Sequence, residues 1–308
     1  MAKFILSAFA DEITPDFDGQ LEALQKLGIP LLELRGVDGR SFTQLTDAEV
    51  DAVGEKLRRA GVGLSALGTP IGKIAVTDDF EAHEALLGRI MDIGDYLGCK
   101  RLRVFSFYRG EGQSVQAYAE AVYRMLGELL DAADARGFTL CHENEKDIFG
   151  DTPQNEKALL DRFGGRLRAV LDSGNFAFCR FDPAPAYGLL KDYIDYMHIK
   201  DADAEGVIVP PGKGCALLEE TLRSLNADYP DRELVLTMEP HLMMFTGLSS
   251  LSKLDDIKHK YSFSTRSRRS RPRLPPCGDA CAALRPCTAF GRVCPAPRRW
   301  RGTRRRDC

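Results

Sequence analysis

The chain has 308 residues, of which 44% are hydrophobic and 28% are charged, and this composition is typical of a soluble globular protein. No stretch approaches the roughly 20 apolar residues that a membrane-spanning helix needs. The opening segment MAKFILSAFADEI reaches acidic residues before any small-residue cleavage site. We therefore expect a cytoplasmic protein with no membrane partner.

The net charge of −3 combines an acidic body with a basic C-terminal tail. Residues 1–261 contain 29 Lys and Arg against 43 Asp and Glu, whereas residues 262–308 contain 13 Arg, no Lys and two Asp. Binding to a nucleic-acid backbone requires a basic face, so the acidic body argues against a nucleic-acid partner. The cysteines of the body stand singly without a CxxC pair, which is typical of reduced thiols in a cytosolic enzyme.

Eight short apolar runs bounded by turn residues predict β-strands. In chain order they cover residues 3–9, 31–37, 62–68, 101–108, 139–145, 167–174, 194–200 and 234–240. Apolar residues spaced three and four apart predict amphipathic helices between them. These helices cover residues 16–27, 46–60, 80–97, 114–135, 154–163 and 216–226. The alternation predicts a (β/α)8 TIM barrel, and an open doubly wound sheet is the alternative.

Glycines follow four of the predicted helices, at Gly28, Gly61, Gly98 and Gly137. A glycine just past the last helical turn can adopt the left-handed conformation that ends a helix. We therefore expect each of these glycines to cap a helix and lead into the next strand.

The composition changes abruptly after residue 261, so we expect a barrel over residues 1–261 and an irregular, disordered tail over residues 262–308. The tail contains six Pro and five Cys and shows neither the strand nor the helix period. Arg without Lys is typical of a GC-rich gene translated out of frame. We hypothesise that a frameshift replaced the eighth crossover helix, which would expose apolar barrel surface and make the chain unstable or aggregation-prone.

Four residues of the types that metal ions favour stand near the ends of four predicted strands: Glu143, Asp172, His198 and Glu239. The carboxyl ends of barrel strands converge at one mouth, so these side chains can meet. Without a cation, two carboxylates about 4 Å apart would repel each other by roughly 4 kcal/mol at an effective dielectric of 20. The layout predicts a site for one divalent metal ion and hence a metal-dependent enzyme.

Residues two apart on a strand point the same way, so further polar side chains would line the same mouth. They are Glu33, Arg35, Glu145, Lys200 and His241. Each allows two interpretations. Glu33 and Arg35 could form a structural ion pair or contact substrate. Glu145 could support the site or pair with Lys146 or a neighbouring Arg, and His241 could contact substrate or cap its strand.

Other polar residues near the strands have simpler expected roles. Lys200 and Asp201 could orient His198 or only cap their strand. His142 alternates away from the barrel interior, which predicts a packed histidine. We expect His83 on the surface of its helix, and Glu12 at the start of a loop.

Several segments together resemble the sugar phosphate isomerase/epimerase group of xylose isomerase-like TIM barrels, which includes inosose isomerases and dehydratases and ketose 3-epimerases. The segments are ELR at 33–35, RVFSFY at 103–108, HENEKDIFGDTP at 142–153, LDSGNF at 171–176, HIKDA at 198–202, PPGKG at 210–214 and MEPHL at 238–242. The resemblance implies that the four predicted ligands bind manganese, cobalt, magnesium or zinc. It also implies a sugar or cyclitol substrate.

The resemblance further implies that Glu143 and Glu239 move protons on opposite faces of the substrate through an enediolate. Asn175 stands where several relatives place a His beside the substrate, and Lys200 would replace an Arg that ketose 3-epimerases often carry. We therefore expect a metal-dependent isomerase or epimerase that can form a homo-oligomer and whose substrate is not a standard ketohexose. The expected substrate contacts are Asn175, Lys200, His241, Glu145 and Arg35.

Three other functions compete with this expectation. A dehydratase acting on an inosose-like substrate would use the same enediolate to expel a hydroxyl group. A nuclease of the endonuclease IV type shares this barrel, but its three-zinc cluster needs more histidines than the five of this chain. A sugar-binding barrel without catalytic activity is the last alternative.

Overall fold

The structure is a computed structural model that describes residues 1–242. Eight parallel strands form a closed barrel in the order β1-β12-β9-β8-β7-β6-β5-β2, each hydrogen-bonded to the next. The strands are β1 (Lys3–Ala8), β2 (Leu31–Leu34), β5 (Gly63–Gly68), β6 (Arg101–Val104), β7 (Thr139–Glu143), β8 (Leu167–Leu171), β9 (Ile194–Ile199) and β12 (Glu233–Met238). Closure confirms the predicted barrel and excludes the open sheet.

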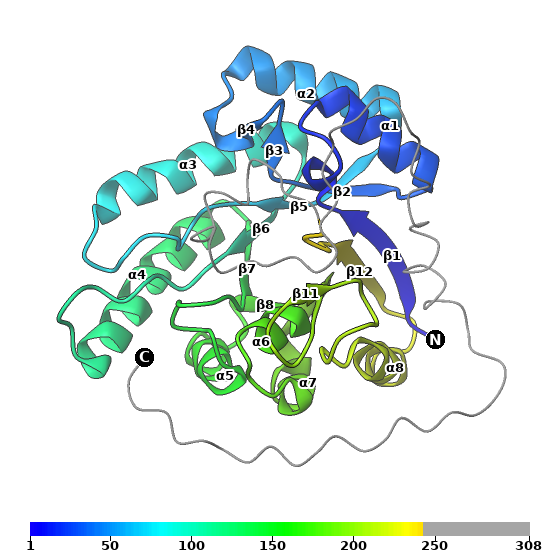
Figure 1. The fold of residues 1–308 in the computed structure, drawn as a ribbon. Helices are drawn as coiled ribbons and strands as arrows, with labels where there is room; N and C mark the ends of the chain where they lie inside the picture. Colours follow the sequence, from blue (N-terminus) through cyan, green and yellow to red (C-terminus); the bar gives the residue numbers. More distant parts are fainter. Residues whose placement is uncertain (243–308) are drawn as a thin grey trace, which may run out of the picture.

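Helices cover the outside of the barrel (Figure 1). Those that the sequence predicts are α1 (Phe17–Leu27), α2 (Asp47–Ala60), α3 (Phe80–Leu97), α4 (Val115–Ala135), α5 (Pro153–Arg162) and α8 (Leu218–Asp228). Two short helices, α6 (Ser173–Phe178) and α7 (Ala184–Leu190), were not predicted and lie between β8 and β9. None of the helices in residues 1–242 combines the length and apolarity needed to cross a membrane.

Small elements decorate the connections between strands and helices. Two-residue strands form the hairpins β3 (Gly36–Val37) with β4 (Arg40–Ser41) and β10 (Asp201–Ala202) with β11 (Ile208–Val209). Three 3₁₀ helices are η1 (Ala10–Glu12), η2 (Phe42–Gln44) and η3 (Lys191–Tyr193). The predictions about the closing crossover helix and the C-terminal tail concern residues that lie outside the described part of the chain.

The predicted glycine caps are confirmed. Gly28, Gly61 and Gly98 end α1, α2 and α3 with φ angles of 68°, 65° and 71°, and Gly137 follows α4 with a φ angle of 68°. Left-handed glycines of this kind satisfy the last carbonyls of a helix at little steric cost. They let each helix turn back to the barrel within a few residues.

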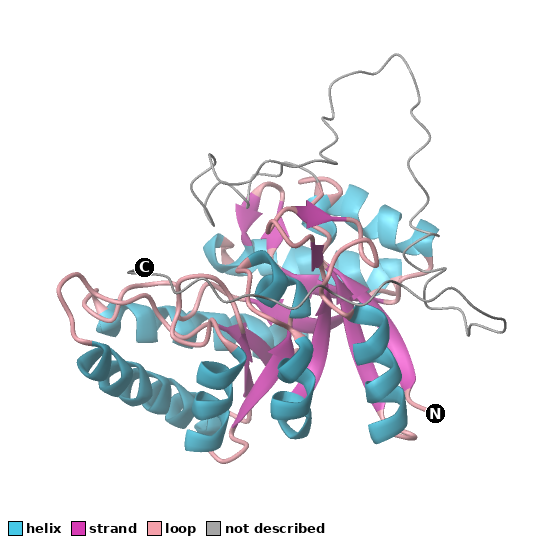
Figure 2. Cartoon of the chain, turned by 60° about the horizontal axis from the view of Figure 1, so that its bottom comes forward, coloured by secondary structure: helices cyan, strands magenta, loops and turns pink. Residues whose placement is uncertain are grey.

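The core has two layers, and their separation shows where the site can lie. The larger apolar cluster contains the inward faces of the helices and the outward faces of the strands. A smaller cluster contains Cys141, Val170 and Tyr196, each two residues before a predicted metal ligand and therefore on the same face of the sheet. Figure 2 shows the strands enclosed by helices. Apolar side chains thus fill the barrel interior beneath a charged mouth.

Candidate metal centre

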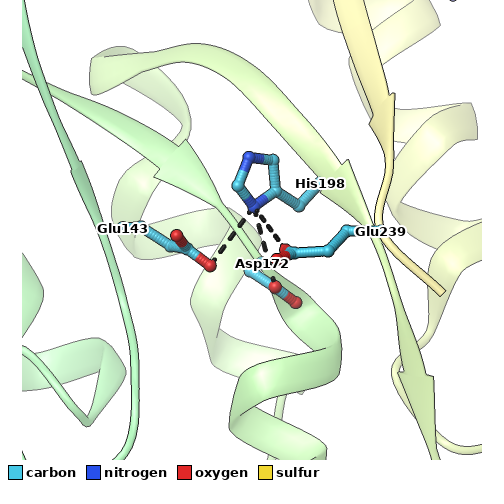
Figure 3. Close-up of side chains that lie close together, drawn as sticks. All are labelled: Glu143, Asp172, His198 and Glu239. Carbon is cyan, nitrogen blue, oxygen red and sulfur yellow. Dashed lines mark ion pairs between the residues drawn. The ribbon is translucent and has the colours of Figure 1, made fainter. Parts of the chain in front are cut away.

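The four predicted metal ligands come together at one point. One donor atom from each of Glu143, Asp172, His198 and Glu239 lies within 4.8 Å of the others (Figure 3). His198 Nδ1 is 3.2 Å from Glu143 Oε1, 3.0 Å from Glu239 Oε2 and 3.9 Å from Asp172 Oδ2. All four residues are buried, with at most 2% of their surface exposed.

Backbone hydrogen bonds fix where these side chains start. Glu143 is the last residue of β7, and Asp172 directly follows β8. Asp172 also caps α6, because its Oδ1 accepts the amide of Asn175 at 2.9 Å, which leaves Oδ2 for the centre. The Glu239 amide donates to the carbonyl of Ile199 at 3.2 Å and so extends the β12–β9 ladder.

Cations neutralise part of the negative charge. Arg103 donates to Glu143 Oε2 at 2.9 Å and Arg35 donates to Glu239 Oε1 at 3.1 Å. Lys200 Nζ lies 3.1 Å from both Asp172 Oδ2 and Glu239 Oε2. Each glutamate therefore points one oxygen at His198 and holds the other against an arginine.

Burial and neighbouring charges shift the pKa values of the three carboxyl groups differently. Burial alone would raise the pKa of Glu239, but Lys200 and the two nearby histidines hold it well below its usual value. Burial also opposes ionisation of Glu143, whose pKa is nevertheless lowered by His198 and Arg103. Burial raises the pKa of Asp172 to about 6 despite the attraction of Lys200.

His198 lies among carboxylates on both sides of its ring. Its Nε2 is 3.1 Å from Glu33 Oε2, opposite the nitrogen that faces the cluster. Burial alone would lower the pKa of His198, but Glu33, Glu143 and Glu239 raise it well above its usual value. In the absence of another cation, a proton on this imidazole balances part of the surrounding negative charge.

The residues present fit a divalent cation. Asp172 Oδ2, His198 Nδ1 and Glu239 Oε2 are buried and make no hydrogen bond within residues 1–242, although the two oxygens form ion pairs with Lys200 at 3.1 Å and with the ring. Buried polar atoms without a hydrogen bond are rare, so three of them facing one point fit a further ligand. In that part of the chain six connected carboxyl groups meet three permanent cations, Arg35, Arg103 and Lys200. Three carboxylates and one imidazole are donors that divalent ions accept.

Four of the five expected substrate contacts lie against the ligands. Arg35, His241 and Lys200 contact Glu239 at 3.1 Å. Asn175 donates to Glu143 Oε1 at 3.1 Å and to the carbonyl of Asn144 at 2.8 Å. Lys200 donates to Asn175 Oδ1 at 3.1 Å. An amide at position 175 can thus hold Glu143 and Lys200 at the same time.

Of the two alternatives for Lys200 and Asp201, only Lys200 lies in the site, where it contacts Asp172 and Glu239, and the ring of His198 contacts Glu33 instead. The Asp201 carboxylate points away from the centre and accepts four backbone amides between 2.8 and 3.0 Å, those of Ala202, Gly212, Gly214 and Ala216. A Cβ atom on Gly214 would lie 2.2 Å from Asp201 Oδ1. Asp201 therefore shapes the PPGKG loop, and only glycine fits beside it.

Glu33 and Arg35, for which an ion pair or substrate contacts were the alternatives, each contact other residues. Arg35 instead binds Asp11 with two hydrogen bonds of 2.9 and 3.0 Å and reaches Glu239 at the mouth. Glu33 lies deeper in the barrel and accepts from the Tyr196 hydroxyl at 2.8 Å. The two side chains of β2 occupy different layers, so they meet different partners.

Glu12 is not merely the start of a loop. It is buried in η1 and its Oε2 accepts the backbone amide of His241 at 2.9 Å. His241 Nε2 lies 3.3 Å from Glu12 Oε1 and 3.1 Å from Glu239 Oε1. Burial, opposed by Arg35, raises the pKa of Glu12 to about 8. His241 thus connects Glu12 to a predicted metal ligand.

Glu145 pairs with Lys73 at 2.6 Å, a partner that was not among the alternatives for this residue. The expectation for His83 needs correction. His83 is buried rather than on the surface, and its Nε2 accepts the amide of Gly72 at 2.8 Å. The helix period placed His83 correctly on α3 but did not show that the loop after β5 folds over it.

His142 is a packed histidine, as expected. It is fully buried behind the barrel wall, with Nε2 3.0 Å from Ser106 Oγ and Nδ1 3.3 Å from Glu156 Oε1. Ser106 Oγ also accepts the amide of Gly150 at 2.8 Å. These residue types resemble a hydrolytic triad, but none of the three side chains is exposed, so they hold the loop after β7 in place.

Sequence reasoning missed Arg103, Lys73 and the contact of Glu33 with His198. Arg103 carried a usable signal, since a charged residue inside the apolar run RLRVF must find a buried partner. Lys73 lies in a loop without a periodic pattern. The partner of Glu33 is 165 positions away, and no local pattern links the two.

Several solved structures share this fold at low sequence identity. A probable 3-DHS dehydratase from Bacillus anthracis has a TM-score of 0.64 and 14% identity, covering 78% of this chain and 92% of that one. A xylose isomerase-like TIM barrel protein from Mycobacterium smegmatis, in complex with magnesium, has a TM-score of 0.61 and 16% identity, covering 82% and 94%.

A D-allulose 3-epimerase from a Methylomonas species, in complex with D-allulose, has a TM-score of 0.61 and 17% identity, covering 78% of this chain and 85% of that one. No curated protein sequence matches this chain. The family described as xylose isomerase-like TIM barrel matches residues 21–254. The match covers most of the chain, which therefore belongs to the xylose isomerase-like TIM barrel family.

Proposed function

We propose that this chain is a divalent-metal-dependent isomerase or epimerase that acts on a sugar or a polyol-derived ketone. The observation that carries the proposal is the meeting of Glu143 and Glu239 at one buried cluster, each with one oxygen toward His198 Nδ1. The family and the similarity in fold to sugar epimerases support it.

The metal ion would be held by Glu143, Asp172, His198 and Glu239. It can be manganese, cobalt, magnesium or zinc. When bound, the ion supplies Lewis acidity that polarises the substrate carbonyl and makes the adjacent C–H bond acidic. Glu143 and Glu239 are the proposed catalytic residues. One would accept the proton from that carbon and the other would return a proton, through an enediolate of the substrate.

The surrounding side chains prepare the two glutamates for this role. A proton acceptor must be ionised before it acts, and the nearby cations lower the pKa of both carboxyl groups, so either can accept the proton. The glutamate that returns a proton would first take it up from solvent. Arg103 and Arg35 also fix the orientation of these carboxylates. The proposed substrate contacts are Asn175, Lys200, His241, Arg35 and Glu145.

Proton NMR in D₂O tests the proposal, with Mn²⁺-loaded protein and a panel of ketoses, inososes and hydroxypyruvate. We expect deuterium to enter one carbon of one substrate class, and Glu143→Gln and Glu239→Gln to slow exchange by about 10²–10⁴-fold. Glu156→Gln is the matched control, because this buried carboxylate contacts a different histidine. The absence of exchange for every substrate would contradict the proposal.

The same experiment separates the dehydratase alternative. After proton removal, an enediolate can also expel a β-hydroxyl group, and one structure of similar fold is described as a probable dehydratase. Deuterium uptake without loss of water supports the isomerase or epimerase. A dehydrated product would assign the lyase reaction to the same residues.

A further inference from the structure

We infer that Glu33 on β2 is a positioning residue for the metal centre, because it makes His198 present Nδ1 to the cation. The inference rests on the proposed metal dependence. None of the contacts described above joins Glu33 to the three carboxylate ligands, so its role acts through His198. Tyr196, two residues before His198 on β9, completes the arrangement.

The hydrogen bonds of Glu33 determine which imidazole nitrogen is available. Glu33 Oε1 accepts from the Tyr196 hydroxyl at 2.8 Å, and Glu33 Oε2 lies 3.1 Å from His198 Nε2. The Glu33 oxygen that faces the ring accepts its N–H group, so this contact places a proton of His198 on Nε2. A neutral imidazole has one N–H group, and its lone pair is then on Nδ1, the atom that faces Glu143 and Glu239.

The ring is also held in place by its apolar neighbours. Phe9 meets His198 edge to face with ring centroids 5.3 Å apart, and Tyr196 does so at 5.5 Å. Tyr196 and His198 point to the same face of β9, so one carboxylate from β2 can bridge them. These contacts oppose rotation that would exchange Nδ1 and Nε2.

The complete burial of Glu33 indicates that this carboxylate has a specific structural or functional role. Its exposed fraction is 0%, and a buried charge is costly unless it is paired and hydrogen-bonded. A carboxylate behind a metal-ligating histidine fixes the ring and increases its basicity, and its loss typically weakens metal binding by about 10–100-fold. Glu33 is placed to do both for His198.

Isothermal titration of the full-length chain with Mn²⁺ tests this role. We expect Glu33→Gln to raise the Kd for Mn²⁺ by about 10–100-fold, and Tyr196→Phe to raise it by a smaller factor. Glu156→Gln is the matched control, since Glu156 is equally buried and also contacts a histidine ring, at 3.3 Å. We expect it to leave the Kd within about threefold, well below that range.

Circular dichroism and thermal unfolding without metal identify variants that do not fold. If Glu33→Gln does not fold, Tyr196→Phe carries the test, and an unchanged Kd in that variant overturns the inference. A folded Glu33→Gln whose Kd is within twofold of the wild type also overturns it, while the proposed function stands. A wild-type chain that binds no Mn²⁺ overturns both.

Discussion

Among residues 1–242, two fully buried histidines each contact a fully buried glutamate, one pair inside the barrel and one behind its wall. His198 contacts Glu33 at 3.1 Å and His142 contacts Glu156 at 3.3 Å, and all four side chains have an exposed fraction of 0%. The residue types, the burial and the spacing are the same. The two pairs differ in what faces the other nitrogen of the ring.

The other nitrogen of His198 faces three carboxylates, whereas that of His142 faces the hydroxyl of Ser106. Burial lowers the pKa of His142 to about 3, and Glu143 opposes this shift. The pKa of His198 is raised well above its usual value because the carboxylates outweigh burial. A buried histidine thus becomes a candidate metal ligand when several carboxylates surround its free nitrogen.

Replacing each histidine separately with glutamine should give the largest difference in Mn²⁺ affinity between the two pairs. His198→Gln removes the only nitrogen donor of the proposed site and should weaken Mn²⁺ binding by more than about 100-fold, beyond the loss typical of a supporting residue. His142→Gln should leave the affinity within a few-fold. Isothermal titration measures both. Equal affinities in the two variants would remove the distinction between the pairs.

Mn²⁺ should raise the free energy of unfolding only when His198 is intact, whereas His142 should not matter. A ligand at 100 times its Kd raises the free energy of unfolding by about 2.7 kcal/mol. We expect this increase for the wild type and for His142→Gln in urea titrations with Mn²⁺, and its loss after chelation. In His198→Gln the same Mn²⁺ concentration should leave the unfolding midpoint unchanged, and a full increase there would place the ion elsewhere.

The pair behind the wall should affect stability without affecting metal binding. Ser106→Ala leaves the Gly150 amide and His142 Nε2 without their shared partner. Leaving a buried polar group unsatisfied costs about 1–3 kcal/mol. Urea unfolding should show this loss while titration shows the wild-type Kd for Mn²⁺. A large change in Kd would mean that this network reaches the centre through the β7 strand.

His83 provides a third buried histidine, and we expect its effect to be the smallest. Burial lowers its pKa, and its Nε2 accepts the Gly72 amide only when that nitrogen carries no proton. The unfolded chain takes up this proton near the ordinary pKa of about 6.5, so the stability contribution is present above that pH and is lost as the pH falls below it.

The effect of one proton cannot exceed about 1.4 kcal/mol per pH unit. Unfolding of the wild type and His83→Gln between pH 7 and pH 5 measures it. We expect the variant to lose less stability on acidification. A steeper loss in the variant would show that His83 is charged in the folded state.

Local patterns were sufficient to predict the frame of the molecule. The strand and helix periods, together with glycines such as Gly28 and Gly61, placed eight strands and six helices within a few residues of their observed positions. The short helices α6 and α7 were missed because each has too few turns for a period to appear. Glu143, Asp172, His198 and Glu239 could be grouped because all four follow or end strands of one parallel set.

The sequence by itself determined that strands and helices alternate and which acidic and histidine residues lie at the carboxyl ends of the strands, because both depend on spacing along the chain. The tertiary structure decided the partners: Glu33 with His198, Arg103 with Glu143 and Lys73 with Glu145. These contacts join residues far apart in the chain, and they form where barrel closure brings side chains into one small volume from which water is excluded. Charge pairing in that volume depends on distance in space, which no local spacing encodes.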